Sequence, residues 1–261
     1  MDPHILYRIH FTVKRPAKAI CGALLLLLAP APPPVAWGQA DPLPWLNGVR
    51  RDAGMPSLAA DDLLCSAARQ WSAALARAGL LGHRGSDGST ALDRYRSLGG
   101  TEARVGEILG AGPKLSGIEE GWMRSAEHRS LALAPQWTHV GWGSDRAGAT
   151  QVWVVLFCQK LVEGLRIERG TGSLVISGTL RPVEAAQPVL LSGLHRVPAR
   201  SWDEGSRRFR FVVAGLVPGD YLRLGYLSPD GAFRLTNAFT LLPGTESPGE
   251  TSRSSAPAPS P

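Results

Sequence analysis

Cysteine is scarce in this chain of 261 residues, and one of its three cysteines, Cys21, lies within the first forty residues. Only Cys65 and Cys158 lie beyond them, which excludes a disulfide-rich scaffold and leaves room for a single disulfide. There is no stripe of Lys and Arg interleaved with aromatic residues, so no nucleic-acid partner is expected. The HExxH, Walker A and GxSxG signatures are also missing, so no local motif indicates a metalloprotease, a P-loop protein or an α/β-hydrolase.

The first forty residues have the order of a secretory signal peptide. Basic residues 1–18 precede the short apolar run "AICGALLLLLA" and a proline-rich segment that ends at Ala40. A bilayer-spanning helix needs roughly 20 apolar residues, so we predict cleavage after Ala40, no transmembrane span, and a secreted or periplasmic protein. An uncleaved N-terminal anchor is the alternative. Without residues 1–40 the formal net charge falls from +6 to +3, so much of the basic character belongs to the leader.

The remaining chain divides into three segments by composition. Residues 41–163 contain the helical periodicity and nearly all of the histidine chemistry, and they end on the strand-like run "QVWVVLFC". Residues 164–242 consist of short apolar runs separated by turn signals such as "VPGDY" and "SPDGA", which predicts a small antiparallel β-sandwich. His195 stands alone there, and we expect it to be a surface residue. Residues 243–261 are rich in Pro, Ser and Gly, which predicts a disordered tail.

Two amphipathic helices are predicted in the first of these segments. Apolar residues recur at i, i+3, i+4 and i+7 from Asp61 to Ala78, and Gly79 supplies a C-terminal stop. Cys65 falls off the centre of this apolar stripe, which favours a disulfide with Cys158 over the alternative of two buried free thiols. A second helix is expected over residues 116–133, with a capping box at its start and Pro135 after its end.

The polar residues that could form a site are far apart in the sequence. His83 follows the first helix, Glu107 lies in the apolar stretch "RVGEILGAG", and His128 lies on the second helix. A carboxylate in such a stretch is costly to bury unless it is paired or hydrogen-bonded. By spacing alone, scattered polar residues of this kind are more often satisfied structural groups than a site.

Five motifs in the right order nevertheless resemble the CAP superfamily, which comprises the cysteine-rich secretory proteins, antigen 5 and the pathogenesis-related proteins. The motifs are "LNGVRRDAGMPSLAADDLLCSAARQWSAALARAGLLGH" at 46–83, "VGEI" at 105–108, "GWMRSAEHR" at 121–129, "THVGWG" at 138–143 and "QVWVVLF" at 151–157. The sequence is most similar to the short exported bacterial members, over residues 43–160. The resemblance implies an α+β fold, a CAP-type α-β-α sandwich, in front of the β-sandwich.

The resemblance also implies a central cleft lined by His83, Glu107 and His128, with Ser125 beside them. Ile108 stands where the family usually has asparagine, which would remove a polar side chain from the cleft rim. Asn47 and Arg50 match the opening motif, and we expect them to be structural. Glu119 and Glu120 lie a turn too early to match the family's second cleft glutamate.

Three functions remain open at this point. The first is a non-catalytic exported module that binds a small molecule, a lipid or an envelope glycan or protein, with His83, His128 and Glu107 able to hold zinc or another divalent metal. The second is an envelope hydrolase, a peptidase or a peptidoglycan-acting enzyme, in which the same groups activate water. The third is an adhesion protein that makes its contacts through the β-sandwich. Whether the chain is an enzyme is undecided by the sequence.

Overall fold

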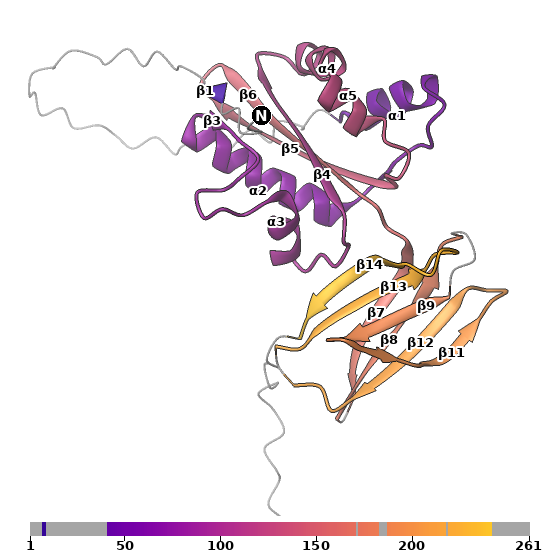
Figure 1. Cartoon of the computed structure of the whole chain (residues 1–261). Helices are drawn as coiled ribbons and strands as arrows, with labels where there is room; N and C mark the ends of the chain where they lie inside the picture. Colours follow the sequence, from indigo (N-terminus) through magenta and orange to yellow (C-terminus); the bar gives the residue numbers. More distant parts are fainter. Residues whose placement is uncertain (1–6, 9–40, 171, 183–186, 218, 242–261) are drawn as a thin grey trace, which may run out of the picture. The chain divides into compact units, whose positions relative to one another are not determined.

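A computed structural model describes residues 7–8, 41–170, 172–182, 187–217 and 219–241 of the chain (Figure 1). The predicted signal peptide and the predicted tail lie outside these residues, apart from Tyr7 and Arg8. The chain divides into two compact units, Met1–Glu163 and Gly164–Pro261. Among the described residues, no helix is long and apolar enough to cross a membrane.

The first unit consists of short helices around one mixed sheet. Its helices are α1 (Leu43–Asp52), α2 (Asp62–Ala78), α3 (Ala91–Ser97), α4 (Leu115–Arg124) and α5 (Ala126–Ala132). Its strands are β1 (Tyr7–Arg8), β2 (Ala59–Ala60), β3 (Leu80–Leu81), β4 (Val105–Gly112), β5 (His139–Ala147) and β6 (Thr150–Cys158). The four-stranded sheet has the order β2-β5-β6-β4, in which β2 and β5 are parallel and the other pairs antiparallel, while β1 pairs with β3.

Helices cover both faces of this sheet, as the α-β-α expectation requires. On one face, α2 and α3 bury apolar side chains against Leu109, Val154 and Leu156. On the other face, α1, α4 and α5 surround Ile108 and Trp153. Because successive side chains of a strand point to opposite faces, β4 contributes Leu109 to one core and Ile108 to the other. The observed architecture is therefore the α+β fold predicted from the sequence.

The first predicted helix is confirmed, and two glycines determine where it packs. Asp61 caps α2 by accepting a hydrogen bond from the Leu64 N–H, and Gly79 ends the helix in the left-handed conformation with φ of 65°. A Cβ atom at Gly141 would lie 2.3 Å from the backbone nitrogen of Cys65, and one at Gly143 would lie 2.3 Å from that of Arg69. Only glycine lets the α2 backbone approach β5 this closely.

The predicted Cys65–Cys158 disulfide is wrong in this structure, because both residues are free, buried thiols. Cys65 does lie off the apolar stripe of α2, but the glycine-bearing strand β5 covers that side of the helix. Cys65 is therefore buried although it lies off the apolar face of α2. The prediction had assumed that only residues on that face would be buried. Burial raises the pKa of Cys65 and, more strongly, that of Cys158, so both thiols are protonated at neutral pH.

The second predicted helix is two helices, and its expected capping box does not form. Helix α4 starts at Leu115, one residue before Ser116. Its N-cap residue is Lys114, whose side chain makes no capping hydrogen bond. The helix breaks at Ser125, which adopts an extended conformation with ψ of 121° and caps α5 by accepting from the His128 N–H. Trp122 is buried as expected and donates from Nε1 to the Leu109 carbonyl at 2.7 Å. The break turns His128 away from the direction that one continuous helix would give it.

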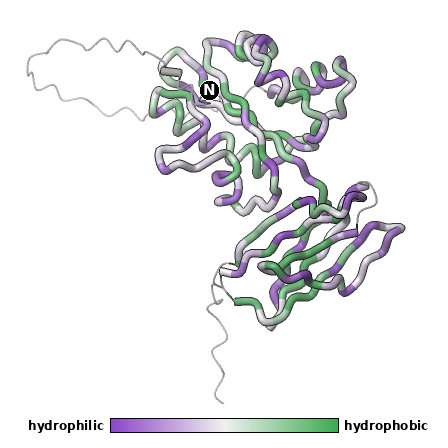
Figure 2. Tube along the Cα trace, viewed as in Figure 1, coloured by the Kyte–Doolittle hydropathy of each residue, from purple (hydrophilic) through white to green (hydrophobic). Residues whose placement is uncertain are grey.

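The second unit is a sandwich of two four-stranded sheets. Its strands are β7 (Val162–Gly170), β8 (Ser173–Leu180), β9 (Pro188–Ser192), β10 (His195–Val197), β11 (Ala199–Asp203), β12 (Arg208–Ala214), β13 (Tyr221–Leu227) and β14 (Phe233–Thr240), in the orders β10-β9-β13-β14 and β11-β12-β8-β7. Hydrophilic and hydrophobic stretches both occur along the strands of this unit (Figure 2). In β12, Phe209, Phe211 and Val213 are buried while Arg208 and Arg210 are exposed, which confirms the predicted period of two.

Candidate functional site

The centre of the candidate site is the carboxylate of Glu107, which lies on β4, at the edge of the sheet. Its side chain is only 4% exposed, and each of its two oxygens has a cationic or imidazole partner. His83 Nδ1 lies 2.8 Å from Oε1, and Arg94 Nη2 lies 2.6 Å from Oε2. A buried carboxylate is stable only when it is paired in this way. The structure thus brings His83 and Glu107, two of the predicted residues, into direct contact.

The segment between α2 and α3 holds the partners of this carboxylate in place. Thr90 and Asp93 form a capping box that starts α3, on which Arg94 follows immediately. Arg94 Nη1 donates to the carbonyls of Ser89 and His83, at 3.0 and 3.3 Å. The same guanidinium that pairs with Glu107 therefore also fixes the backbone that carries His83.

The hydrogen bond to Glu107 determines which nitrogen of His83 is available. A carboxylate can only accept, so Nδ1 of His83 carries the proton and donates it. In the neutral ring, Nε2 then keeps its lone pair. The His83 side chain as a whole is 59% exposed.

His128 is near enough to His83 for the two rings to interact electrostatically, but no hydrogen bond or ion pair joins it to His83 or Glu107 in the part of the chain that the structure describes. Burial is the main cause that lowers the pKa of His128, and repulsion by the His83 ring lowers it further. The residue is therefore a neutral, half-buried imidazole at pH 7. Ser125, the fourth predicted residue, serves as the N-cap of α5 and accepts the His128 N–H at 3.4 Å. Its hydroxyl positions the helix start that carries His128.

Ile108 does not affect the rim of the site, contrary to our expectation. It lies on the opposite face of β4 from Glu107 and is buried with Trp122 and Trp153. The isoleucine is therefore a core residue of the α4 side of the sheet. The two other acidic residues considered, Glu119 and Glu120, lie on α4; Glu120 forms an exposed i,i+4 pair with Arg124 at 3.4 Å.

Arg94 is the residue that sequence reasoning missed. Two signals were present: the Thr90-x-x-Asp93 capping box predicts a helix start there, and a carboxylate in an apolar strand requires a cationic partner. Neither signal tells which of the many arginines reaches Glu107. In the structure the Arg94 guanidinium also lies over the Trp71 ring, with Cζ 3.9 Å from the ring centroid. This cation–π contact adds a third restraint on its position.

Whether these residues could bind a metal ion depends on the donor atoms that they offer. The lone pair of His83 Nε2 and the neutral ring of His128 are the ligand type that zinc prefers, and a carboxylate bonded to Nδ1 of a ligating histidine is its usual support. Within the described ranges, no group of three or more His, Cys, Asp and Glu side chains is arranged to hold a metal ion. The chain therefore offers two imidazoles and a supporting carboxylate.

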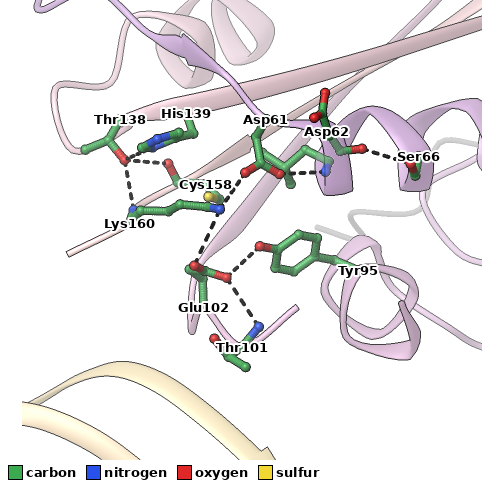
Figure 3. A network of polar contacts seen from close by, with 11 residues as sticks. Asp61, Asp62, Ser66, Tyr95, Thr101, Glu102, Thr138, His139, Cys158 and Lys160 are labelled. Carbon is green, nitrogen blue, oxygen red and sulfur yellow. Dashed lines mark hydrogen bonds and ion pairs between the residues drawn. The ribbon is translucent and has the colours of Figure 1, made fainter. Parts of the chain in front are cut away.

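A second buried polar network lies where β4 begins and β6 ends (Figure 3). Lys160 Nζ pairs with Asp61 and lies 3.8 Å from Glu102 Oε1. Glu102 in turn accepts a hydrogen bond from the hydroxyl of Tyr95, a fully buried residue of α3. Burial and the adjacent Glu102 raise the pKa of Tyr95 far above its ordinary value, so the phenol remains a donor. The network joins the start of α2 to α3, the helix that carries Arg94.

Asn47 and Arg50 are structural, as expected. The Asn47 side chain bonds both the carbonyl and the N–H of Leu58. Arg50 has no exposed surface, and its guanidinium donates to the carbonyls of Pro56, Ala132 and Ala134. These bonds fasten α1 to the end of α5 and thereby support the helix that carries His128.

Comparison with known proteins shows one match to a protein family. The family model of the cysteine-rich secretory protein family, CAP, matches residues 45–159. The curated protein YkwD of Bacillus subtilis (strain 168), which is described as uncharacterized, is 28% identical over 115 residues, or 44% of each chain. The present chain thus spans less than half the length of that relative.

Solved structures with partial similarity include two bacterial proteins. An outer surface protein from Borrelia burgdorferi has a TM-score of 0.43 and 20% identity, over 45% of this chain and 88% of that chain. An extracellular protein containing a SCP domain from Bacillus anthracis str. Ames has a TM-score of 0.42 and 23% identity, over 45% and 39% of the two chains.

Proposed function

Residues 45–159 form a CAP domain of bacterial type, and on this premise we propose that the protein is an exported, non-catalytic binding module whose histidines hold a divalent metal ion. The observation that carries the proposal is the contact of 2.8 Å between His83 Nδ1 and Glu107 Oε1. It orients the imidazole and directs the lone pair of Nε2 away from the carboxylate. The ligand that this module takes in the cell envelope is a small molecule, a lipid, a glycan or a protein.

His83 and His128 would be the metal ligands, with Glu107 as the orienting carboxylate. The hydrogen bond from Nδ1 to Glu107 would fix the orientation of the His83 ring and leave the opposite nitrogen free for the metal ion. The lowered pKa of His128 keeps its ring unprotonated at neutral pH, so a metal ion would not have to displace a proton there. A bound zinc ion would supply an electrophilic centre for an oxygen or nitrogen atom of the ligand.

The position of Glu107 favours binding over hydrolysis. A general base must accept a proton from water, whereas both oxygens of Glu107 are already engaged by His83 and Arg94. The envelope-hydrolase alternative rests on His128, since a neutral imidazole of lowered pKa is suited to remove a proton at pH 7. Hydrolysis of peptidoglycan or peptides that is lost in His128→Ala and retained in the matched variant His195→Ala would favour this alternative.

Calorimetric titration with zinc chloride tests the metal site. The purified chain should bind one zinc ion, and His83→Ala and His128→Ala should each weaken binding by about tenfold or more. His195→Ala, which removes an exposed histidine of the second unit, should bind zinc like the parent. Equal zinc affinity in the parent and in the His83 and His128 variants would refute the site.

Export is tested by processing of the chain. The mature protein recovered from the periplasm or the medium should begin at Asp41, because cleavage is proposed after Ala40. N-terminal sequencing of the recovered protein gives the answer directly. A protein that retains residues 1–40 in the membrane fraction would instead support an uncleaved anchor.

A further inference from the structure

A polar pocket of about 320 Å³ lies between α2, the loop of residues 82–90 and α3. The side chains of Gln70, Trp71, Asp87 and Ser97 line it, together with Arg94. Its volume is at the lower end of the range for small-ligand sites. His83 and Glu107 are not among the residues that line this pocket, although Arg94 borders both sites.

The loop that forms one wall is held in a single shape by its own hydrogen bonds. Asp87 Oδ1 accepts from the Ser89 N–H at 2.9 Å, and the Gly85 N–H donates to the Ser89 carbonyl at 2.9 Å. A Cβ atom at Gly85 would lie 2.4 Å from Asp87 Oδ1 and 2.5 Å from Ser89 Oγ, so glycine provides the room for both side chains. A wall that is already ordered costs little entropy when a ligand binds.

The charges around the pocket favour a neutral ligand. Hydrogen bonds from Ser89 lower the pKa of Asp87, so this carboxylate is ionised at neutral pH and repels an anion. The charge of Arg94 is compensated by Glu107, and its guanidinium covers one face of the Trp71 ring. A ligand cation would therefore compete with Arg94 for the aromatic ring.

The hydrogen-bonding groups are those that recognise hydroxyls. Asp87 supplies an acceptor, Gln70 both a donor and an acceptor, and Ser97 a hydroxyl that can do either. The indole ring of Trp71 lines the pocket beside these groups. The apolar surface of the same indole suits the C–H face of a pyranose ring.

We propose that this pocket binds one neutral sugar unit of a glycan, with Asp87 and Gln70 on its hydroxyls and Trp71 as the apolar wall. The site is separate from the metal site, and it rests on the proposed function in one respect: it selects the glycan among the ligands named there and gives it a place on the chain. It would give the module a carbohydrate ligand whether or not His83 and His128 bind zinc.

The indole N–H resonances in a ¹H–¹⁵N spectrum of the full chain test the proposal directly. Trp71→Phe identifies the Trp71 signal among those of the eight tryptophans. The probes are cellotetraose, maltotetraose and chitotetraose at millimolar concentration. At least one of them should shift the Trp71 signal in a saturable manner, whereas the anionic tetragalacturonate should not.

Both variants alter exposed side chains; Asp87→Ala also removes a hydrogen bond of the loop, whereas Gln70→Ala leaves the loop's hydrogen bonds intact and tests the contact with the sugar by itself. Asp87→Ala and Gln70→Ala should each weaken binding of the sugar by about tenfold, because each removes hydrogen bonds to it. Asp52→Asn, which alters an exposed carboxylate on α1, is the matched control and should leave the affinity unchanged. No shift of Trp71 with any tetrasaccharide, or equal affinity in the Asp87 and Gln70 variants, would overturn the assignment.

The outcome is independent of the metal titration. Asp87→Ala should bind zinc like the parent, and His83→Ala should bind the sugar like the parent. If Asp87→Ala loses sugar binding but still binds zinc, the result supports the pocket. If the parent protein does not bind zinc, the metal site is refuted but the sugar result is unaffected.

Discussion

Substitution of Gly141 by alanine should destabilise the first unit by pushing α2 away from β5. The new Cβ would lie 2.3 Å from the Cys65 nitrogen and 2.4 Å from the Leu64 carbonyl carbon, and both are backbone atoms that cannot rotate away. Since nonbonded atoms pack at about 3.5 Å or more, the helix must withdraw by roughly 1 Å. Overpacking of this kind costs about 1–3 kcal/mol, and we expect the upper part of the range because the whole helix must move.

Urea denaturation followed by the helical signal in circular dichroism measures this cost, because every helix of the described chain belongs to the first unit. The matched control is Gly117→Ala on α4, where a Cβ would meet no atom within 4 Å. That variant should be neutral or more stable by about 0.5–1 kcal/mol, the ordinary gain of alanine in a helix. A Gly141→Ala protein with the parent's midpoint would refute the close approach of α2 to β5.

Four further results are expected. Arg50→Met should cost about 3 kcal/mol or more in urea denaturation, because three carbonyls lose their donor. An NMR titration should give His128 a pKa below about 6.5, and His83→Ala should raise it by removing the repulsion of the second imidazole; an unchanged pKa would show that the rings are far apart. Burial acts to raise the pKa of Asp61, but the Lys160 hydrogen bond outweighs it and lowers the pKa. This contribution to stability is present above the unfolded pKa of about 3.9 and is lost as the pH falls through the lower folded value; Lys160→Met should therefore unfold at a higher pH in an acid titration monitored by fluorescence. A thiol assay of the denatured, unreduced mature protein should find two free thiols. A result of no free thiols would instead support the predicted Cys65–Cys158 disulfide.

Local patterns in the sequence were sufficient for the elements that depend on near neighbours. The period of α2, its stop at Gly79 and the alternation of Phe209 and Phe211 on β12 were all correctly predicted. These features follow from which face of an element is apolar, and that is decided by residues a few positions apart. The order of the CAP motifs added the architecture, which periodicity alone does not specify.

The long-range partners could not be predicted in the same way. The sequence contains the buried glutamate and the helix start before Arg94, but nothing local shows that this arginine rather than another reaches Glu107. The helix break at Ser125 was missed because the apolar pattern continues across it, whereas the serine cap interrupts the helix there. Cys65 was misjudged because its burial depends on glycines of β5 more than seventy residues away.

The amino-acid sequence by itself determined the apolar faces, the turns and the family-like order of motifs, since each depends on the chemistry of adjacent residues. The tertiary structure decided which charges meet, which thiols are covered and which imidazoles share an electrostatic environment. The physical reason is that pairing and burial depend on distance in space, and only the packing of helices on both faces of the sheet brings His83, Arg94 and Glu107 together.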